Sequence, residues 1–221
     1  MVVWKKRYKG MKMREKSFME RCFRYILGFA IMTLGIAISI KSNLGVSPVS
    51  SIPYTITCVT GLEMGKATIV FHTALVLLQI LIKGRSFQVK NLLQILAGVL
   101  FGYLTTFGNW VMSFVIFPEN LLFRIMMMLI STVLIAIGLS LYVPANLMPL
   151  AAEGTILAIS EKFRFEFSNV KICFDVTVVT ISLIVCLIAL HSAGSVGIGT
   201  VASAFLVGME MKWIKKIISK I

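Results

Sequence analysis

Charged residues are scarce in this chain. They make up 14% of its 221 residues and only nine of them are acidic, whereas 58% of the chain is apolar. The mean hydropathy is +0.93, so a soluble domain of this composition would expose too much hydrocarbon surface to water. The scarcity of charge therefore predicts an all-α polytopic membrane protein whose solvent is the lipid bilayer.

Metal ligands and catalytic groupings are scarce as well. The four cysteines show no C-x-x-C spacing and there are only two histidines, so no metal site is predicted. No Ser/His/Asp spacing and no pair of carboxylates on one helix is present to carry a reaction. We therefore expect no enzyme activity and no cofactor. A signal-peptide cleavage site is also missing behind the first apolar run, so we expect the first helix to be retained.

Long apolar runs are the dominant feature of what is present. A helix needs about 20 apolar residues to cross a hydrocarbon core of about 30 Å. The stretches 46–60 and 149–162 are apolar but too short and too polar to cross the membrane. Their prolines and hydroxyls are typical of broken or re-entrant helices that line a polar cavity. Six runs meet the length requirement: about 22–41, 67–83, 91–117, 121–143, 171–191 and 195–211.

The chain also contains a weak internal repeat. A shift of 103 positions places Gly35 on Gly138, Asn43-Leu44 on Asn146-Leu147, and His72 on Asp175, without a gap. An apolar run precedes each Asn-Leu pair and a polar kink follows it. Chance similarity between two leucine-rich stretches is the alternative. The pattern predicts two copies of one membrane unit, repeat 1 over 22–117 and repeat 2 over 121–211.

Positive charge predicts how these repeats lie in the membrane. Of the 22 Lys and Arg residues, 19 lie in the first 24 residues, in the loops at 83–90 and 161–171, or after residue 211. All four regions fall on one side if both short segments are re-entrant, and positive charge favours the cytoplasm. We therefore expect a bacterial cytoplasmic membrane protein with both termini cytoplasmic. Three crossings per repeat make the two repeats inverted, as alternating access requires.

The basic residues outside the spans point to lipid. The formal net charge is +13, but these residues flank membrane spans and do not form one solvated domain, so no nucleic-acid partner is expected. Residues 1–21 instead form a basic cytoplasmic arm suited to anionic lipid, and residues 212–221 form a basic cytoplasmic tail. Glycine pairs such as Gly98 and Gly102 are predicted to pack helices closely, and such faces would permit a homodimer.

Two carboxylates are the strongest candidates for a functional site, because an ionisable group at bilayer depth is costly unless it has a function or a partner. Asp175 lies four residues after Lys171, so the two share one helix face. They are predicted to bind or gate a charged substrate, or Asp175 to take up a proton, and a plain ion pair at the helix end is the alternative. His72, at the equivalent position of repeat 1, is titratable near neutral pH or is a hydrogen-bonded core residue.

Glu153 is the second carboxylate. A helix that starts near Pro149 would point its free amides into a cavity and would carry Glu153 in its first turn. The site can then hold an anion at the amides, or a cation or proton at the carboxylate, unless Glu153 only caps its own helix. The matching neighbourhood of repeat 1 has no charge. The predicted substrate-binding residues that complete this site are polar and neutral: Asn43, Ser47, Ser50, Ser51, Tyr54 and Asn146.

These motifs together resemble the YczE/YyaS/YitT-type family of bacterial integral membrane proteins, over about residues 22–210. The resemblance is carried by Leu27-Gly28, Gly35, Asn43-Leu-Gly-Val-Ser-Pro48, Leu93-Gln94, Leu100-Phe-Gly-Tyr103, Pro149 with Glu153-Gly154, Gly197-Ile-Gly-Thr200 and Gly208. It implies an integral membrane protein of unsettled function, often regarded as a transporter. The family's Pro-Arg-Asp-Gly motif keeps its acid here and lacks its arginine, and Lys171 and Asp175 stand where Arg and Glu are usual.

The sequence therefore predicts a secondary transporter of a small polar or ionic solute. We expect the solute to bind between the two broken segments, with Glu153 and Asp175 as proton-linked or cation-binding groups. The alternative is an accessory membrane protein that transports nothing and docks a cytoplasmic partner through its basic face.

Overall fold

The computed structural model describes residues 17–116 and 120–218, and within these ranges the chain is helical without a strand. Short 3-10 turns follow α4 and α6 and precede α5, at Gly84–Ser86, Val143–Ala145 and Val89–Leu92. The helices are α2 (Phe18–Ser42), α3 (Pro48–Thr60), α4 (Met64–Lys83), α5 (Leu93–Ser113), α6 (Leu121–Tyr142), α7 (Ala151–Phe163), α8 (Phe167–Leu190) and α9 (Ile198–Ile218).

Five of these helices, α2, α4, α5, α6 and α8, are long and apolar enough to cross a bilayer. This confirms the expected class, a helical membrane protein. Among the described residues, the apolar stretch of α9 covers Ile198–Met211, which is shorter than the five candidate spans. The sixth crossing therefore stays a prediction.

The two short segments predicted to be broken are separate helices. α3 and α7 each have 13 residues, about 20 Å at 1.5 Å per residue, which is less than the hydrocarbon core. Asn43, before α3, and Asn146, before α7, both adopt the left-handed conformation, with φ of 53° and 50°. A left-handed residue ends a helix and turns the chain sharply. Each Asn-Leu pair is thus the turn between a long helix and a short one.

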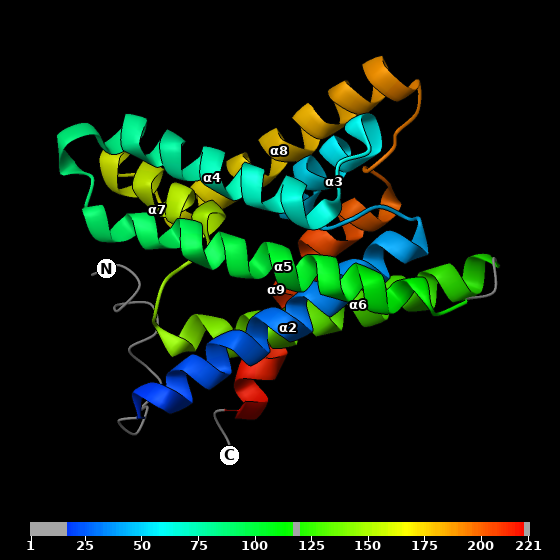
Figure 1. Cartoon of the computed structure of the whole chain (residues 1–221), viewed down its shortest axis with the longest axis horizontal. Coiled ribbons are helices and arrows are strands. Elements are labelled where there is room, and N and C mark those ends of the chain that lie inside the picture. The colour runs from blue at the N-terminus through cyan, green and yellow to red at the C-terminus, as the bar shows by residue number, and fades with distance from the viewer. Residues whose placement is uncertain (1–16, 117–119, 219–221) are drawn as a thin grey trace.

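The centre of the molecule is the contact between α2 and α6, which lie side by side and run in opposite directions (Figure 1). Glycines allow the close approach, since a Cβ on Gly138 would lie 2.6 Å from the Gly28 carbonyl oxygen. α5 packs on α2, and α9 packs on α6. The Phe29 ring, fully buried, meets the rings of Phe101 and Tyr142 edge-on, at centroid distances of 5.2 and 5.1 Å.

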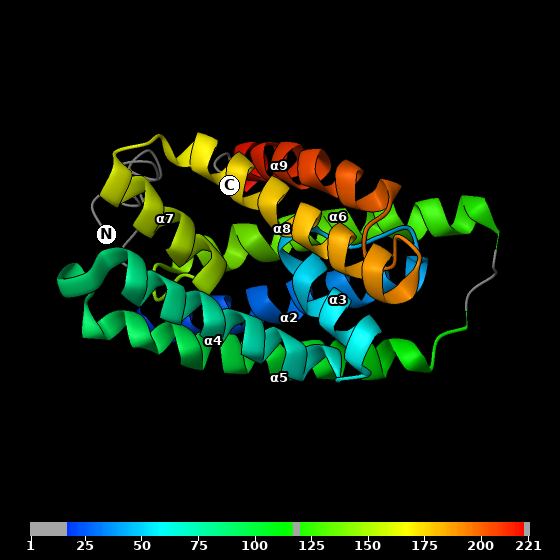
Figure 2. The same ribbon diagram turned by 90° about the horizontal axis from the view of Figure 1, so that it is seen from above.

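The short helices lie toward opposite ends of the molecule (Figure 2), where α3 packs on α8 and α7 packs on α4. We call the end at which α2 starts and α4 and α7 finish the cationic end, because Arg21, Lys83, Lys90, Lys162 and Arg164 belong to it. The other end, at which α2 and α8 finish, is the far end. Residues 1–16 of the predicted basic arm lie outside the described residues.

Candidate functional site

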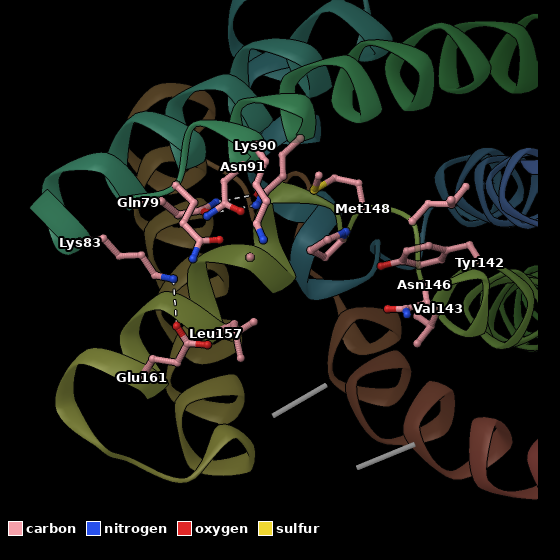
Figure 3. Close-up of a pocket in the computed structure, with 15 residues that line it drawn as sticks. Gln79, Lys83, Lys90, Asn91, Tyr142, Val143, Asn146, Met148, Leu157 and Glu161 are labelled. Atoms are coloured by element: carbon pink, nitrogen blue, oxygen red, sulfur yellow. Dashed lines mark hydrogen bonds and ion pairs between the residues drawn. The ribbon is translucent and has the colours of Figure 1, made fainter. Parts of the chain in front are cut away.

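A polar cavity of about 310 Å³ lies at the cationic end (Figure 3). Its walls are the end of α4, the start of α5, the loop between α6 and α7, and one face of α7. Amide and charged side chains from all of these elements point into it. The polar lining residues are Gln79, Lys83, Gln88, Lys90, Asn91, Gln94, Asn146 and Glu161.

A reciprocal amide pair forms the deep wall of this cavity. Gln79 Nε2 donates to Gln94 Oε1 at 2.9 Å, and Gln94 Nε2 donates back to Gln79 Oε1 at 3.2 Å. Gln79 Nε2 also donates to the Ala151 carbonyl at 3.1 Å, which ties the start of α7 to α4. Both glutamines are almost fully buried, at 1% and 2% exposure, so the pair satisfies amides that would otherwise be costly. Gly154 leaves room for it, because a Cβ there would lie 2.8 Å from Gln94 Nε2.

An ion pair stands at the mouth of the cavity. Lys83, the last residue of α4, contacts Glu161 of α7 at 2.9 Å. The next residue of α7, Lys162, donates to the Ile82 carbonyl at the end of α4. Cations near a helix C-terminus compensate its unpaired carbonyls. The last turns of α4 and α7 are therefore fastened to each other.

The loop between α6 and α7 is held from α2. Arg21 Nε donates to the Ala145 carbonyl at 2.8 Å, and Arg21 Nη2 donates to the Asn146 carbonyl at 2.6 Å. One turn further along, the Tyr25 hydroxyl donates to the Met148 carbonyl at 2.9 Å. These carbonyls follow a helix end and have no partner within a helix. α2 thus fixes the loop that forms one wall of the cavity.

Glu153 lies in the first turn of α7, as predicted. Glu153 does not line the cavity, although its neighbour Gly154 and the nearby Tyr142 both do, and it interacts electrostatically with Lys171 and Asp175. Its Oε2 atom is buried and has no hydrogen-bond partner among the described residues. Such an arrangement suits a group that gains and loses a proton or a cation.

Lys171 and Asp175 form the predicted pair on one face of α8. The Lys171 ammonium reaches both carboxylate oxygens, at 2.5 and 2.6 Å, and both side chains are partly buried. Lys171 is paired with the Asp175 carboxylate. Of the two acids, Glu153 is therefore the one without an ion pair in the described chain.

Most of the predicted repeat 1 residues lie away from the cavity. Asn43 ends α2 and is exposed at the far end. Ser47 donates to Ser50 at 3.0 Å, and Ser51 accepts from Ser182 of α8 at 3.0 Å. The Ser51 hydroxyl therefore joins α3 to α8, whereas the Ser47–Ser50 bond stays within the start of α3. Asn146, at the position that the shift of 103 relates to Asn43, lines the cavity.

Tyr54 and His72 belong to the packed interior. Tyr54 packs against the main apolar core, which includes Phe101. His72 is 2% exposed and meets the Phe71 and Phe101 rings edge-on, and its Nδ1 has no hydrogen-bond partner in the described residues. Between the starts of α3 and α7 lies a second apolar cluster, formed by Phe71, Leu75, Val76, Ala151 and Ala152 with Val49 and Ile52 against it.

Several polar residues that make buried contacts were not predicted to be site residues. Gln79 and Gln94 are amides inside apolar helices. That placement is the sequence feature that could have indicated a buried polar contact. Glu210 is a lone acid in the apolar run of α9, where its Oε1 accepts from the Thr132 hydroxyl at 3.0 Å. Arg21 gave no signal, because its partners lie 124 and 125 residues away.

The far end contrasts with the cationic end, because backbone fills it. Gly199 N donates to the Leu44 carbonyl at 2.7 Å, and Val46 N donates to the Ser195 carbonyl at 3.3 Å. Gly45 has a φ of 105°, and a Cβ there would lie 2.6 Å from the Gly197 nitrogen. The turn after α2 and the turn before α9 therefore close this end by direct main-chain contact.

Comparison with known proteins gives the chain a family. Residues 19–216 match a family of unknown function, DUF6198, which accounts for nearly the whole chain. The chain belongs to this family. A relative from Haemophilus influenzae, an uncharacterized protein, is 27% identical over 198 residues, 89% of this chain and 84% of the relative. The uncharacterized protein YyaS of Bacillus subtilis is 25% identical over 200 residues, 89% of this chain and 92% of YyaS.

These relatives make this DUF6198 protein one of a set found in bacteria. They confirm the YyaS part of the predicted resemblance and give no support to the YczE and YitT labels. No solved structure matches the chain. The geometry described above is therefore the basis for any statement about function.

Proposed function

We propose that this DUF6198 protein is a secondary transporter of a small polar or ionic solute in the bacterial cytoplasmic membrane. One observation carries the proposal: positions related by the shift of 103 touch at the far end and surround a cavity at the cationic end. Gly45 and Gly197 meet main chain to main chain. Their equivalents, Met148 and Gln94, line the 310 Å³ cavity. Two equivalent gates in opposite states are what alternating access requires.

Helix packing supports the inverted repeat on which this proposal rests. The shift of 103 relates the bounds of α3, Pro48–Thr60, to those of α7, Ala151–Phe163, without adjustment. It also relates the packing of α3 on α8 to that of α7 on α4, and the packing of α2 on α5 to that of α6 on α9. α2 and α6 run in opposite directions, as do α4 and α8 (Figure 1). An inversion would produce this pattern.

Single contacts support the same relation. The Ser51 hydroxyl of α3 approaches the Val178 carbonyl of α8 at 3.5 Å. On the other side, the Thr155 hydroxyl of α7 approaches the Leu75 carbonyl of α4 at 3.4 Å. Leu75 and Val178 are equivalent under the shift, so each short helix meets the same carbonyl of its partner. In the transport cycle we expect the far end to open when the cavity at the cationic end closes.

Positive charge supports the direction of the opening. The end that holds the cavity carries Lys83, Lys90, Lys162 and Arg164, and short loops rich in Lys and Arg stay in the cytoplasm. In this proposal the structure is the state open to the cytoplasm, with both termini on that side.

Glu153 is the proposed coupling group. Its buried Oε2 lacks a hydrogen-bond partner in the described chain, while the adjacent Gly154 borders the solute cavity. A movement of α7 that closes the cavity would also change the distance of Glu153 from the Lys171–Asp175 pair. Occupation of the cavity and protonation, or cation binding, at Glu153 are thereby linked.

A thermal-unfolding screen of the detergent-purified protein against small metabolites and ions tests the proposal. A ligand at a hundred times its dissociation constant adds about 2.7 kcal/mol of stability. We expect a compound that raises the unfolding midpoint of the wild type, and expect Glu153→Gln to lose or weaken that response. Glu63→Gln is the matched control, because Glu63 lies at the far end beside Lys66.

Uptake of the identified compound into proteoliposomes then separates transport from binding. Uptake that requires Glu153 would support a coupled transporter. A compound that binds but does not cross the membrane would contradict the proposal, and a screen without any response would favour the accessory role instead.

A further inference from the structure

An apolar groove of about 630 Å³ lies between α4 and α8, on the opposite side of α7 from the polar cavity. Leu157 of α7 faces the cavity, whereas Thr155 and Ile159 face the groove. Three lining residues of α4 are equivalent, under the shift of 103, to three lining residues of α8: Phe71, Leu75 and Leu78 of α4, and Phe174, Val178 and Ile181 of α8.

The groove has the depth of one membrane leaflet. It runs along α8 from Asn169, near the cationic end, to Ile181, which is twelve residues or about 18 Å of helix. Half of the hydrocarbon core of a bilayer is about 15 Å. α8 is also the least covered of the five candidate spans, with 17% of its most apolar window buried, against 39% to 50% for the others. The groove is therefore placed where acyl chains of the leaflet at the cationic end would enter it.

Cationic and aromatic side chains lie at the end of the groove. Phe165, which lines it, is exposed and stacks on Phe163 with ring centroids 6.1 Å apart. Arg164, between them, ends α7 in the left-handed conformation, and its side chain is exposed. The Ser160 hydroxyl donates to the Phe165 carbonyl at 2.7 Å and fixes this turn. Exposed aromatics beside a cation are typical of the membrane interface, where phosphate groups lie.

We propose that the groove binds one acyl chain of an anionic phospholipid, whose phosphate is held by Arg164. The apolar walls select a hydrocarbon chain, and the arginine can donate two parallel hydrogen bonds to a phosphate. It favours a headgroup of net negative charge, because the choline cation of a zwitterionic lipid would repel it. A phospholipid is the occupant that matches both ends of the site, since a second copy of the chain would offer no phosphate to Arg164. This site is independent of the solute cavity.

Native mass spectrometry of the full-length protein tests the site. The delipidated protein is exposed to vesicles of equal parts phosphatidylglycerol and phosphatidylcholine, and retained lipid is counted. We expect phosphatidylglycerol to be retained about five- to tenfold more than phosphatidylcholine, and expect Arg164→Gln to abolish most of this preference. Lys66→Gln, which removes a cation at the far end, is the control and is expected to behave as the wild type.

A second pair of variants tests the groove itself. Thr177 is exposed and lines the groove, so Thr177→Trp is expected to fill it and remove both lipids. Val176 is the neighbouring exposed residue of α8 outside the groove, so Val176→Trp is expected to retain lipid as the wild type does. Equal retention of the two lipids by the wild type, or unchanged retention by Thr177→Trp, would overturn the proposal. So would a lipid-free dimer that Thr177→Trp dissociates, because a second copy would then cover the groove.

Discussion

The two ends of this molecule differ in how they are built, because main-chain contact closes the far end and a cavity lies at the cationic end. At the far end, the turns at 43–47 and 195–199 meet through main-chain hydrogen bonds, with glycines at the contact. At the cationic end, the equivalent positions carry Met148 and Gln94, and a cavity separates their surroundings. The contact between the turns at the far end is made by backbone groups and needs no ion pair. At the far end, glycines let the backbones touch, whereas at the cationic end long side chains connect backbones that lie farther apart.

The same contrast holds where each short helix meets its long partner. Ser182, on α8, makes a single hydroxyl contact with Ser51 of α3. Its equivalent on α4 is Gln79, which donates to both Gln94 and the Ala151 carbonyl. Short hydroxyls thus join α3 to α8, and longer amides, which also form a wall of the cavity, join α7 to α4. The comparison predicts which substitutions will be felt most at each end.

The largest effect is expected at Gly197. In Gly197→Ala the new methyl group would collide with the Leu44 carbonyl, and the neighbouring backbone has little room to move. We expect the free energy of unfolding to fall by about 2 to 3 kcal/mol, the usual result of overpacking. Unfolding of the purified protein by titration with SDS measures this. Labelling of a cysteine placed at Ser47 should also become faster as the far end loosens.

Gly208 provides the matched control for this prediction. A Cβ at Gly208 would have nothing within 4 Å, and the residue lies inside α9. Gly208→Ala is therefore expected to leave stability unchanged or to raise it by up to about 1 kcal/mol, since alanine favours a helix. If both variants lose the same stability, the far end is not closed by glycine contact.

The next effect concerns the amide pair of the cavity wall. Gln79→Leu would leave the buried Gln94 amide without its donor and acceptor, and would leave the Ala151 carbonyl with the Thr155 hydroxyl as its side-chain donor, at about 2 kcal/mol of lost stability. Ser182→Ala, at the equivalent position, loses one hydroxyl contact and should lose about 1 kcal/mol. A double substitution of Gln79 and Gln94 by Leu should cost less than the sum of the single changes. Strict additivity in SDS unfolding would contradict a coupled pair.

Local rules predicted much of this fold. The short segments after Asn43-Leu44 and Asn146-Leu147 were predicted from their polar kinks, although the left-handed conformation of the two asparagines was not. The four-residue spacing of Lys171 and Asp175 placed them in contact because both lie on one helix. The position of Glu153 in the first turn of α7 followed from Pro149. Each of these depends on residues close in sequence, where helix geometry is sufficient.

Contacts between distant segments could not be predicted in this way. The pairing of Gln79 with Gln94 depends on how α4 and α5 lie against each other, and the sequence around a lone amide in an apolar run does not indicate which residue it contacts. Arg21 lies in the first turn of a helix, where an exposed arginine is ordinary, yet it holds carbonyls of the loop after α6. Placement of the cavity at one end likewise depends on how α4, α5, α7 and the loop after α6 pack together.

A smaller effect is expected when the loop over the cavity is released. Arg21→Gln removes the donors to the Ala145 and Asn146 carbonyls, and because the site is partly exposed, water replaces part of the loss. We expect about 1 kcal/mol of destabilisation, together with faster hydrogen exchange at residues 145–148. Arg24→Gln, which removes only an exposed pair with Glu20, should change neither. Equal exchange in the two variants would show that Arg21 does not hold this loop.

The smallest effects are expected at the ion pairs, and they still distinguish the two ends. Lys83 and Glu161 are 17% and 35% exposed, whereas Lys66 and Glu63, at the far end, are 68% and 42% exposed. Water and salt screen the more exposed pair, so Glu161→Gln should lower the free energy of unfolding by about 0.5 to 1 kcal/mol and Glu63→Gln by less than about 0.3 kcal/mol. Unfolding measured at low and high salt checks this, because only the first difference should shrink visibly with added salt. A loss at Glu63 as large as that at Glu161 would mean that charge contributes equally at both ends, and that the far end does not close by backbone contact alone.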